Sequence, residues 1–276
     1  LCLRMSMTAL LLAVTTVAAM PLPTPTATPD PCAGLLAELN RPTVGYSPCA
    51  VKKGALVAEL GYQHETTAAP ASTSLVQVPQ GFFRYGVASR FEVDFIGPNA
   101  NLQRSAIGSA YGFSDSGLGV KYSLPPSQRW ELGVDGLYAT PNGAFAFTAG
   151  TSTYTVNADA SYQLTPATSL GATVALGSTG GFTAAGELVR YGSFMPSILV
   201  LEQTSTISQA YFEYVDASRV SADFGNRAFF DAGFQQLLGK RLEVDVEFGH
   251  ALTADPRLGF NYVGAGVGVS IGGASP

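Results

Sequence analysis

The sequence has few charged residues and, after its first twenty positions, no long hydrophobic run. Only 13% of its 276 residues are charged, whereas a globular domain averages about 25%. Yet 46% are hydrophobic and the mean hydropathy is +0.20. Beyond the N-terminus no stretch reaches the roughly 18 apolar residues that a spanning helix requires. Such a chain is typical of the alternating strands of a membrane β-barrel.

Basic residues and histidines are also scarce. The 15 Lys and Arg are outnumbered by 20 Asp and Glu, and the absence of a basic stripe argues against nucleic acid as a partner. His64 with Glu65, or His250 with Asp255, could serve as a hydrolytic base. Neither histidine accompanies a nucleophile motif, so we expect no enzymatic activity and no cofactor.

Cysteine is rare, with three in the chain. Cys2 belongs to the expected export signal. Cys32 and Cys49 remain as an even pair in an exported protein, which predicts one disulfide closing a small N-terminal loop. Two free thiols are the alternative. A zinc site has too few candidate ligands, so no metal is expected.

The N-terminal fifty residues divide into two segments. Residues 1–19 resemble a signal peptide, because Arg4 precedes the apolar "TALLLAVTTVAA" and small residues occupy the cleavage positions. A short membrane anchor is the alternative. Residues 20–52 are proline-rich ("MPLPTPTATPDP"), which indicates a periplasmic segment or a plug within a lumen.

Residues 53–276 show one alternating segment after another, as in "RFEVDF" (90–95). Pro196 interrupts one expected strand, and the alternation slips phase around Pro79, which indicates a bulge. We expect twelve strands, at about 54–64, 73–85, 89–97, 113–124, 129–139, 152–163, 168–177, 193–202, 207–216, 226–238, 241–250 and 259–271.

The connections between these strands alternate strictly between short and long. The short ones lie at 87–89, 125–128, 165–168, 203–206 and 239–240, and the long ones at 65–72, 98–112, 140–151, 178–192, 217–225 and 251–258. Short periplasmic turns, longer external loops and an even strand number define an up-and-down antiparallel transmembrane β-barrel. The sequence therefore predicts an all-β barrel in the bacterial outer membrane. A soluble secreted sandwich is the alternative fold.

Aromatic residues bracket two of the expected strands. Trp130 and Tyr138 lie at the ends of one apolar face, and Tyr154 and Tyr162 lie at the ends of another. Eight residues at about 3.3 Å each, tilted as barrel strands are, approach the height of the apolar band. This spacing predicts aromatic girdles facing lipid.

The opposite faces carry most of the charge, as in "RLEVDVEF" (241–248). The residues expected to line the lumen are Arg84, Arg90, Glu92, Asp94, Lys121, Glu131, Asp135, Asp159, Glu213, Asp231, Glu243, Asp245 and Glu247. They could form an acidic pore that favours cations or neutral solutes with donor groups. Alternatively, Arg84 and Arg90 could join neighbouring strands in a network that fills the interior.

Several segments resemble the outer-membrane proteins of the MetA-pathway phenol-degradation family. They are "FFRYGVASRFEVDF" (82–95), "DSGLGVKYSL" (115–124), "ATPNG" (139–143), "YFEYVDASR" (211–219) and "GAGVGVSI" (264–271). The resemblance covers about 80–271 and implies a transporter-like barrel linked to uptake of aromatic or other small hydrophobic compounds. The matching positions are Arg84, Tyr85, Gly86, Arg90, Glu92, Lys121, Tyr122, Pro141, Gly143 and Glu213.

These observations predict an outer-membrane channel for passive uptake of small aromatic or hydrophobic solutes. Its expected partners are outer-membrane lipid, a small-molecule solute and the barrel-assembly machinery. The rival hypothesis is a structural or adhesive barrel whose lumen is closed by salt bridges.

Overall fold

The computed structural model describes residues 30–67, 72–223 and 225–272. The expected signal peptide, Cys2 and the first ten residues of the proline-rich segment lie outside the described residues. Within them, no helix is long and apolar enough to cross a membrane. The one α-helix they contain, α1 (Leu35–Glu38), is short.

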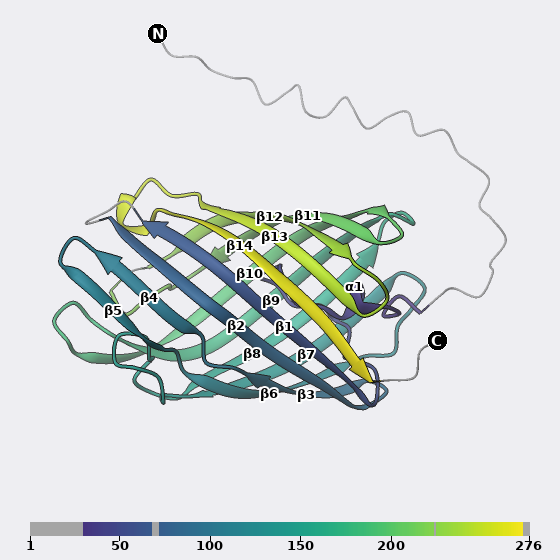
Figure 1. The fold of residues 1–276 in the computed structure, drawn as a ribbon, viewed down its shortest axis with the longest axis horizontal. Coiled ribbons are helices and arrows are strands. Elements are labelled where there is room, and N and C mark those ends of the chain that lie inside the picture. The colour runs from purple at the N-terminus through teal and green to yellow at the C-terminus, as the bar shows by residue number, and fades with distance from the viewer. Residues whose placement is uncertain (1–29, 68–71, 224, 273–276) are drawn as a thin grey trace, which may run out of the picture.

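Antiparallel strands make up nearly all of the rest (Figure 1). They are β1 (Ala55–Thr67), β2 (Thr73–Ala88), β3 (Phe91–Ile96), β4 (Ala100–Ser105), β5 (Gly108–Phe113), β6 (Ser116–Ser123), β7 (Trp130–Thr140), β8 (Thr153–Gln163), β9 (Thr168–Phe182), β10 (Leu188–Ser205), β11 (Ser208–Ala217), β12 (Arg227–Leu237), β13 (Leu242–Ala251) and β14 (Phe260–Gly272). A short 3-10 helix, Pro256–Leu258, precedes β14.

The sheet closes on itself because β1 pairs with both β14 and β2. The segments β3 and β4 both pair with β2 in one continuous register, from Phe82↔Ile96 to Gln77↔Asn101. They form one strand interrupted at Pro98, which has no N–H for the ladder. The segments β5 and β6 likewise form one strand, so the described residues build a twelve-stranded barrel. The predicted fold class is confirmed.

The strands are longer at the external end than the sequence indicated. The expected loops at 98–112 and 178–192 are wrong, because β4 and β5 form a hairpin and β9 pairs with β10 up to Phe182↔Leu188. Gly, Ser and Asn are frequent in these segments. They weaken the alternation of apolar and polar residues, so the sequence did not indicate that the strands continue there. The strand around Pro196 is continuous from Leu188 to Ser205. A register shift between β1 and β2 at Gly61/Gln63 lies close to the expected bulge near Pro79.

The barrel exterior is apolar. Phe95, Leu118, Val134, Val156 and Val246 are among its exposed side chains. An apolar belt around a closed barrel suits lipid on every side, and places the chain in the bacterial outer membrane. By the usual sidedness of such barrels, the end with short turns faces the periplasm.

Aromatic pairs stand at both ends of β7 and β8. The rings of Trp130 and Tyr162 are 4.7 Å apart at the short-turn end, and those of Tyr138 and Tyr154 are 5.2 Å apart at the other end. The aliphatic residues between them are exposed. This is the spacing of two interfacial girdles.

Candidate functional site

Residues 30–54, which we call the plug, bind side chains that project into the barrel. The last residue of the plug lies beside β2, where the Gly54 N–H donates to the Gly86 carbonyl at 2.7 Å. A disulfide joins Cys32 to Cys49 and closes a loop that contains α1. Figure 1 shows α1 near the end of the barrel where β14 finishes.

Arg84 is the centre of the contact between the plug and β1–β3. Its guanidinium is fully buried and pairs with Glu59 at 3.0 Å and Glu92 at 2.8 Å. It also donates to two plug carbonyls, those of Glu38 and Cys49. A buried cation is stable only when it is paired and hydrogen-bonded in this way.

The two carboxylates beside Arg84 bind the plug as well. Glu59 accepts the N–H groups of Asn40 at 3.0 Å and Arg41 at 2.7 Å, and Glu92 accepts the N–H of Val51. Bonds between a carboxylate and backbone N–H groups are charge-assisted and stronger than neutral ones. Each carboxylate thus binds Arg84 and the plug backbone at once.

Strand β6 adds a second group of anchors. The Lys121 ammonium donates to the Ser47 carbonyl at 2.7 Å and to Asn40 Oδ1 at 3.2 Å. Ser123 donates to the Pro48 carbonyl at 2.6 Å and accepts the Ala50 N–H at 2.5 Å. The plug therefore docks along β6 through both backbone and side-chain groups.

The plug supplies one cation of its own. Arg41 donates to Gln80 at 2.9 Å and forms ion pairs with Asp245 and Glu247 on β13, each at 3.2 Å. These acidic partners raise the pKa of Arg41 despite its burial. Its carbonyl accepts from Gln235 on β12 at 2.9 Å. Arg41 was not singled out in the sequence, because nothing in the plug's composition indicated where it would dock.

The inner turn of the plug rests on Glu213 of β11. The carboxylate is fully buried and accepts the N–H of Val44 at 2.8 Å and of Gly45 at 2.9 Å. The next N–H, from Tyr46, donates to Thr173 Oγ1 at 3.1 Å. We call residues 44–46 the latch. A Cβ at Gly45 would lie within 3 Å of Glu213 and Thr173 oxygens, so only glycine fits.

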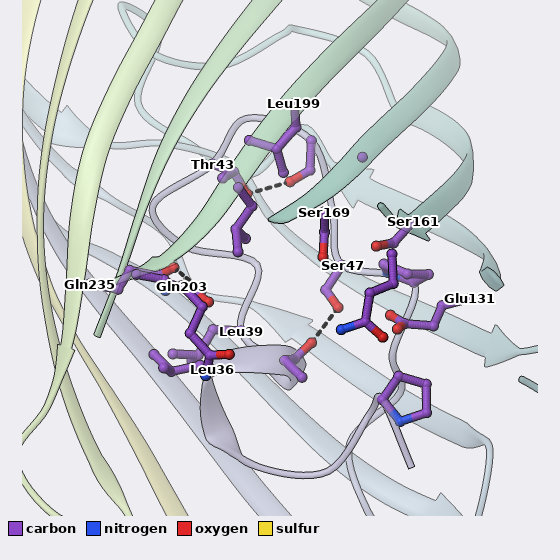
Figure 2. A pocket seen from close by; sticks show the side chains of 18 of the residues that line it. Leu36, Leu39, Thr43, Ser47, Glu131, Ser161, Ser169, Leu199, Gln203 and Gln235 are labelled. Carbon is purple, nitrogen blue, oxygen red and sulfur yellow. Dashed lines mark hydrogen bonds between the residues drawn. The ribbon is translucent and has the colours of Figure 1, made fainter. Parts of the chain in front are cut away.

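A cavity of about 430 Å³ lies between the plug and β8–β12. It begins at the short turns, with Ala167 and Thr206, and ends at Gly45 and Glu213. Because those turns face the periplasm, we call it the periplasmic vestibule. Figure 2 shows Leu36 and Leu39 of the plug on one side, Glu131 and Ser161 on another, and Leu199 at the top of the view.

The external half of the lumen contains an apolar cluster. Val215, Phe229, Phe260 and Tyr262 pack together there, with Val44 of the latch against them. The rings of Phe229 and Phe260 are 5.3 Å apart. The latch therefore separates an aromatic external half from the vestibule.

The other residues expected to line the lumen are placed as follows. Asp135 accepts from Asn157 at 2.7 Å, Asp159 from Thr173 at 2.8 Å and Asp231 from Tyr211 at 2.9 Å. Asp94 and Glu243 are also buried, and Glu131 is half-buried. The ammonium of Lys121 on β6 interacts electrostatically with Asp94, Asp135 and Asp159.

Arg90 differs from the rest. It lies in the turn between β2 and β3, half-buried at the periplasmic rim. Within the described residues, the ion pairs of the lumen involve Arg41 and Arg84 and none involves Arg90. The expectation that Arg90 helps to join strands across the lumen is therefore wrong, because β3 starts at Phe91, two residues later than the pattern indicated.

The residues carried by the family resemblance fall into two classes. Tyr85 and Tyr122 face outward and are exposed. Gly86 faces inward, where a Cβ would meet the backbone of Lys52 at 2.1 Å. Gly143 donates to Asp115 at 2.8 Å in the external loop that starts at Pro141. Of Tyr85, Tyr122, Gly86 and Gly143, only Gly86 contacts the plug.

Burial also changes the titration of Glu38 at the end of α1. Desolvation raises the pKa of its carboxyl to about 7, against the opposing charges of Lys52 and Arg84. The same carboxyl accepts the Lys52 N–H at 3.3 Å. Docking of the plug therefore involves a group that titrates near neutral pH.

The two histidines do not meet the acids considered for catalysis. His64 contacts Ser74 Oγ at 2.9 Å, and His250 contacts Asn261 Oδ1 at 2.6 Å. Cys32, Cys49 and Glu131 offer ligand atoms within 4.8 Å of one another. Because both sulfurs are in a disulfide, they lack the thiolate that binds a metal ion.

Two solved structures share this architecture. The COG4313 outer membrane channel from Pseudomonas putida F1 superposes with a TM-score of 0.63 at 13% identity, over 80% of this chain and 97% of that one. The NanC porin gives a TM-score of 0.51 at 12% identity, over 78% and 98%. No family model matches the sequence, and no curated protein matches it either. These similarities establish the fold as that of outer-membrane barrels.

Proposed function

We propose that this protein is an outer-membrane channel for passive passage of small aromatic or hydrophobic solutes. The observation that carries the proposal is the vestibule beside the plug. A barrel filled only for stability would pack its interior fully, whereas here the wall of β8–β10 stays apart from the plug. The fold shared with a channel and a porin supports the proposal.

The solute class rests on the external half of the lumen. Phe229, Phe260 and Tyr262 form a buried aromatic cluster there, and aromatic side chains contact apolar and aromatic solutes well. The family resemblance of residues 80–271 implies the same class. Weak, successive contacts of this kind allow flux, because tight binding at one residue would stop it.

Passage requires the latch to move. Val44 and Gly45 close the inner end of the vestibule through Glu213, and Tyr46 closes it through Thr173. We propose that release of these three hydrogen bonds joins the vestibule to the external half, while the rest of the plug stays docked on Arg84.

Ion conductance of the refolded protein in a planar bilayer under a salt gradient tests the channel. We expect brief, cation-selective openings, because the carboxylates beside the latch outnumber the bases. Complete silence from correctly folded protein, also after the latch is weakened by Gly45→Ala, would contradict the proposal.

The second candidate is a structural barrel with a permanently closed lumen. The buried network of Arg84, Glu59 and Glu92 favours it, because that network fixes the plug to β1–β3. The silent outcome of the bilayer experiment would make this candidate the preferred one. Under either candidate we propose the barrel-assembly machinery as a partner.

A further inference from the structure

The charged groups that face the vestibule are unbalanced. Asp30, Arg41, Glu131 and Glu213 line it. The guanidinium of Arg41 is already occupied by Asp245, Glu247 and Gln80. The charge left for a ligand is therefore negative, contributed by three carboxylates.

Within the described residues, no hydrogen-bond donor contacts the carboxylate of Glu131. The Cys49 sulfur lies 3.6 Å from Oε2, but it carries no hydrogen because it is in a disulfide. No basic nitrogen of the described residues lies within 4.0 Å of it. A half-buried carboxylate without a donor gains most from a ligand with charged N–H groups.

Glu213 closes the other end of the vestibule. It is fully buried, and its two oxygens accept one backbone N–H each, from Val44 and Gly45. Among the residues that the structure describes, no basic nitrogen lies within 4.0 Å of it, and Arg41 and Arg84 are paired elsewhere. A ligand that brings its own charged N–H groups could take the place of these two donors and would also neutralise the buried charge.

The walls between the two carboxylates carry polar side chains and a set of leucines. Leu36 and Leu39 come from the plug, and Leu199, Leu201 and Leu237 come from the barrel. A ligand that fits must have a charged head and an apolar body, and the volume of about 430 Å³ limits that body to one ring or a short chain.

We propose that the vestibule binds small organic cations, an ammonium group on an apolar body. Glu131 meets the ammonium first, and Glu213 exchanges the latch N–H groups for those of the ligand. The ligand thereby opens the latch that would otherwise block it. This inference rests on the proposed function, because it names the solute class for the same path.

Equilibrium dialysis of the refolded full chain in a neutral detergent tests the binding. The probes are benzylamine, which is cationic at neutral pH, and benzyl alcohol, which has the same ring without the charge. We expect benzylamine to be retained at least about tenfold more tightly, the size of one charge-assisted hydrogen bond. Equal retention of the two probes would overturn the inference.

Glu131→Gln is the decisive variant, because its side chain is only half-buried and the change keeps its shape. We expect it to abolish the preference for benzylamine. Glu187→Gln, on an exposed external loop, is the matched control and should keep the preference. An unchanged preference in Glu131→Gln would overturn the inference. Glu213→Gln should lower the retention as well.

Bilayer recordings separate this inference from the proposed function. Selective retention of benzylamine without conductance in any condition would support the binding site and contradict the channel. Conductance that benzylamine neither raises nor blocks, together with equal retention of both probes, would support the channel and overturn the cation site. We expect benzylamine added on the short-turn side to increase the frequency of openings.

Discussion

Two walls of the lumen treat the plug differently. The wall of β1–β3, β6 and β13 binds it through Arg84, Lys121 and Arg41 with their carboxylates. Within the described residues, the wall of β8–β10 is joined to it by a single recorded hydrogen bond, from Tyr46 to Thr173. Strong charge-assisted contacts hold the plug on one wall, whereas the neutral residues of the other wall leave the latch free to move.

Replacement of Arg84 should have the largest effect, because it breaks the anchoring wall. Arg84→Met leaves Glu59 and Glu92 buried without a counter-charge, at a cost of about 3–5 kcal/mol. We expect the plug to undock, so that chymotrypsin cleaves after Tyr46, which is half-buried in the docked plug, and conductance rises. Arg104→Met, at an exposed position of β4, is the control. If Arg84→Met resists chymotrypsin as well as the wild type and shows no higher conductance, Arg84 is not the main anchor.

Removal of the disulfide should come next. Cys32 and Cys49 are separated by 17 positions, and closing a loop of this length is worth about 3 kcal/mol in the chain-entropy account. In the double variant Cys32→Ser/Cys49→Ser, we expect residues 30–39 to leave the vestibule more often. Longer open times in a bilayer would measure this, and addition of a reductant to the wild type should reproduce it. Identical recordings for all three samples would contradict the expectation.

Gly45→Ala tests the weaker wall. The added Cβ would lie 2.7 Å from Ser197 Oγ and 2.8 Å from Thr173 Oγ1, which costs about 1–3 kcal/mol as overpacking. We expect more frequent openings while the barrel keeps its heat-modifiable migration on gels. Gly136→Ala, where a Cβ meets open space, is the matched control. Loss of folding in Gly45→Ala would instead assign the latch to the anchoring network.

The smallest expected effect is that of pH on the anchoring wall. Burial raises the pKa of Glu38 from 4.5 to about 7, so its contribution to docking is present below pH 4.5 and is lost as the pH rises through 7. The whole shift corresponds to at most about 3 kcal/mol, of which a change from pH 5 to pH 8 samples only a part. We expect chymotrypsin cleavage after Tyr46, divided by its rate on an unfolded peptide at the same pH, to be faster at pH 8 than at pH 5. Glu38→Gln should reduce the difference, and a difference that persists would assign it to other carboxylates.

Much of the barrel could be predicted because alternation is a local property. A strand buried on one face only must alternate, and Leu242 and Val246 face outward while Glu243 and Asp245 face inward, as the pattern indicated. The external ends were predicted less well, since the small and polar residues of β5 and β9 weaken the alternation there. Arg90 was assigned to a strand although it lies in the preceding turn, because the last residue of a turn and the first residue of a strand cannot be told apart by alternation.

The candidate site could be predicted only in part. The inward direction of Glu92, Lys121 and Glu213 could be predicted, because alternation along each strand decides it. Nothing in the sequence indicated that their partners would be backbone groups of the plug, since Val44 and Gly45 carry no polar side chain to mark them. A backbone N–H is present at almost every residue, so its partner cannot be read from composition.

The barrel, its apolar exterior and its acidic interior all follow from a period of two along each strand, which can be read from the sequence. What the acids do depends on how the folded strands are arranged around the plug. Closure of the sheet brings Glu59 of β1, Glu92 of β3 and Glu213 of β11 around one N-terminal segment. Buried carboxylates need donors, and the plug supplies them on one wall while leaving Glu131 without one. That difference depends on which strands meet the plug, and no local pattern contains it.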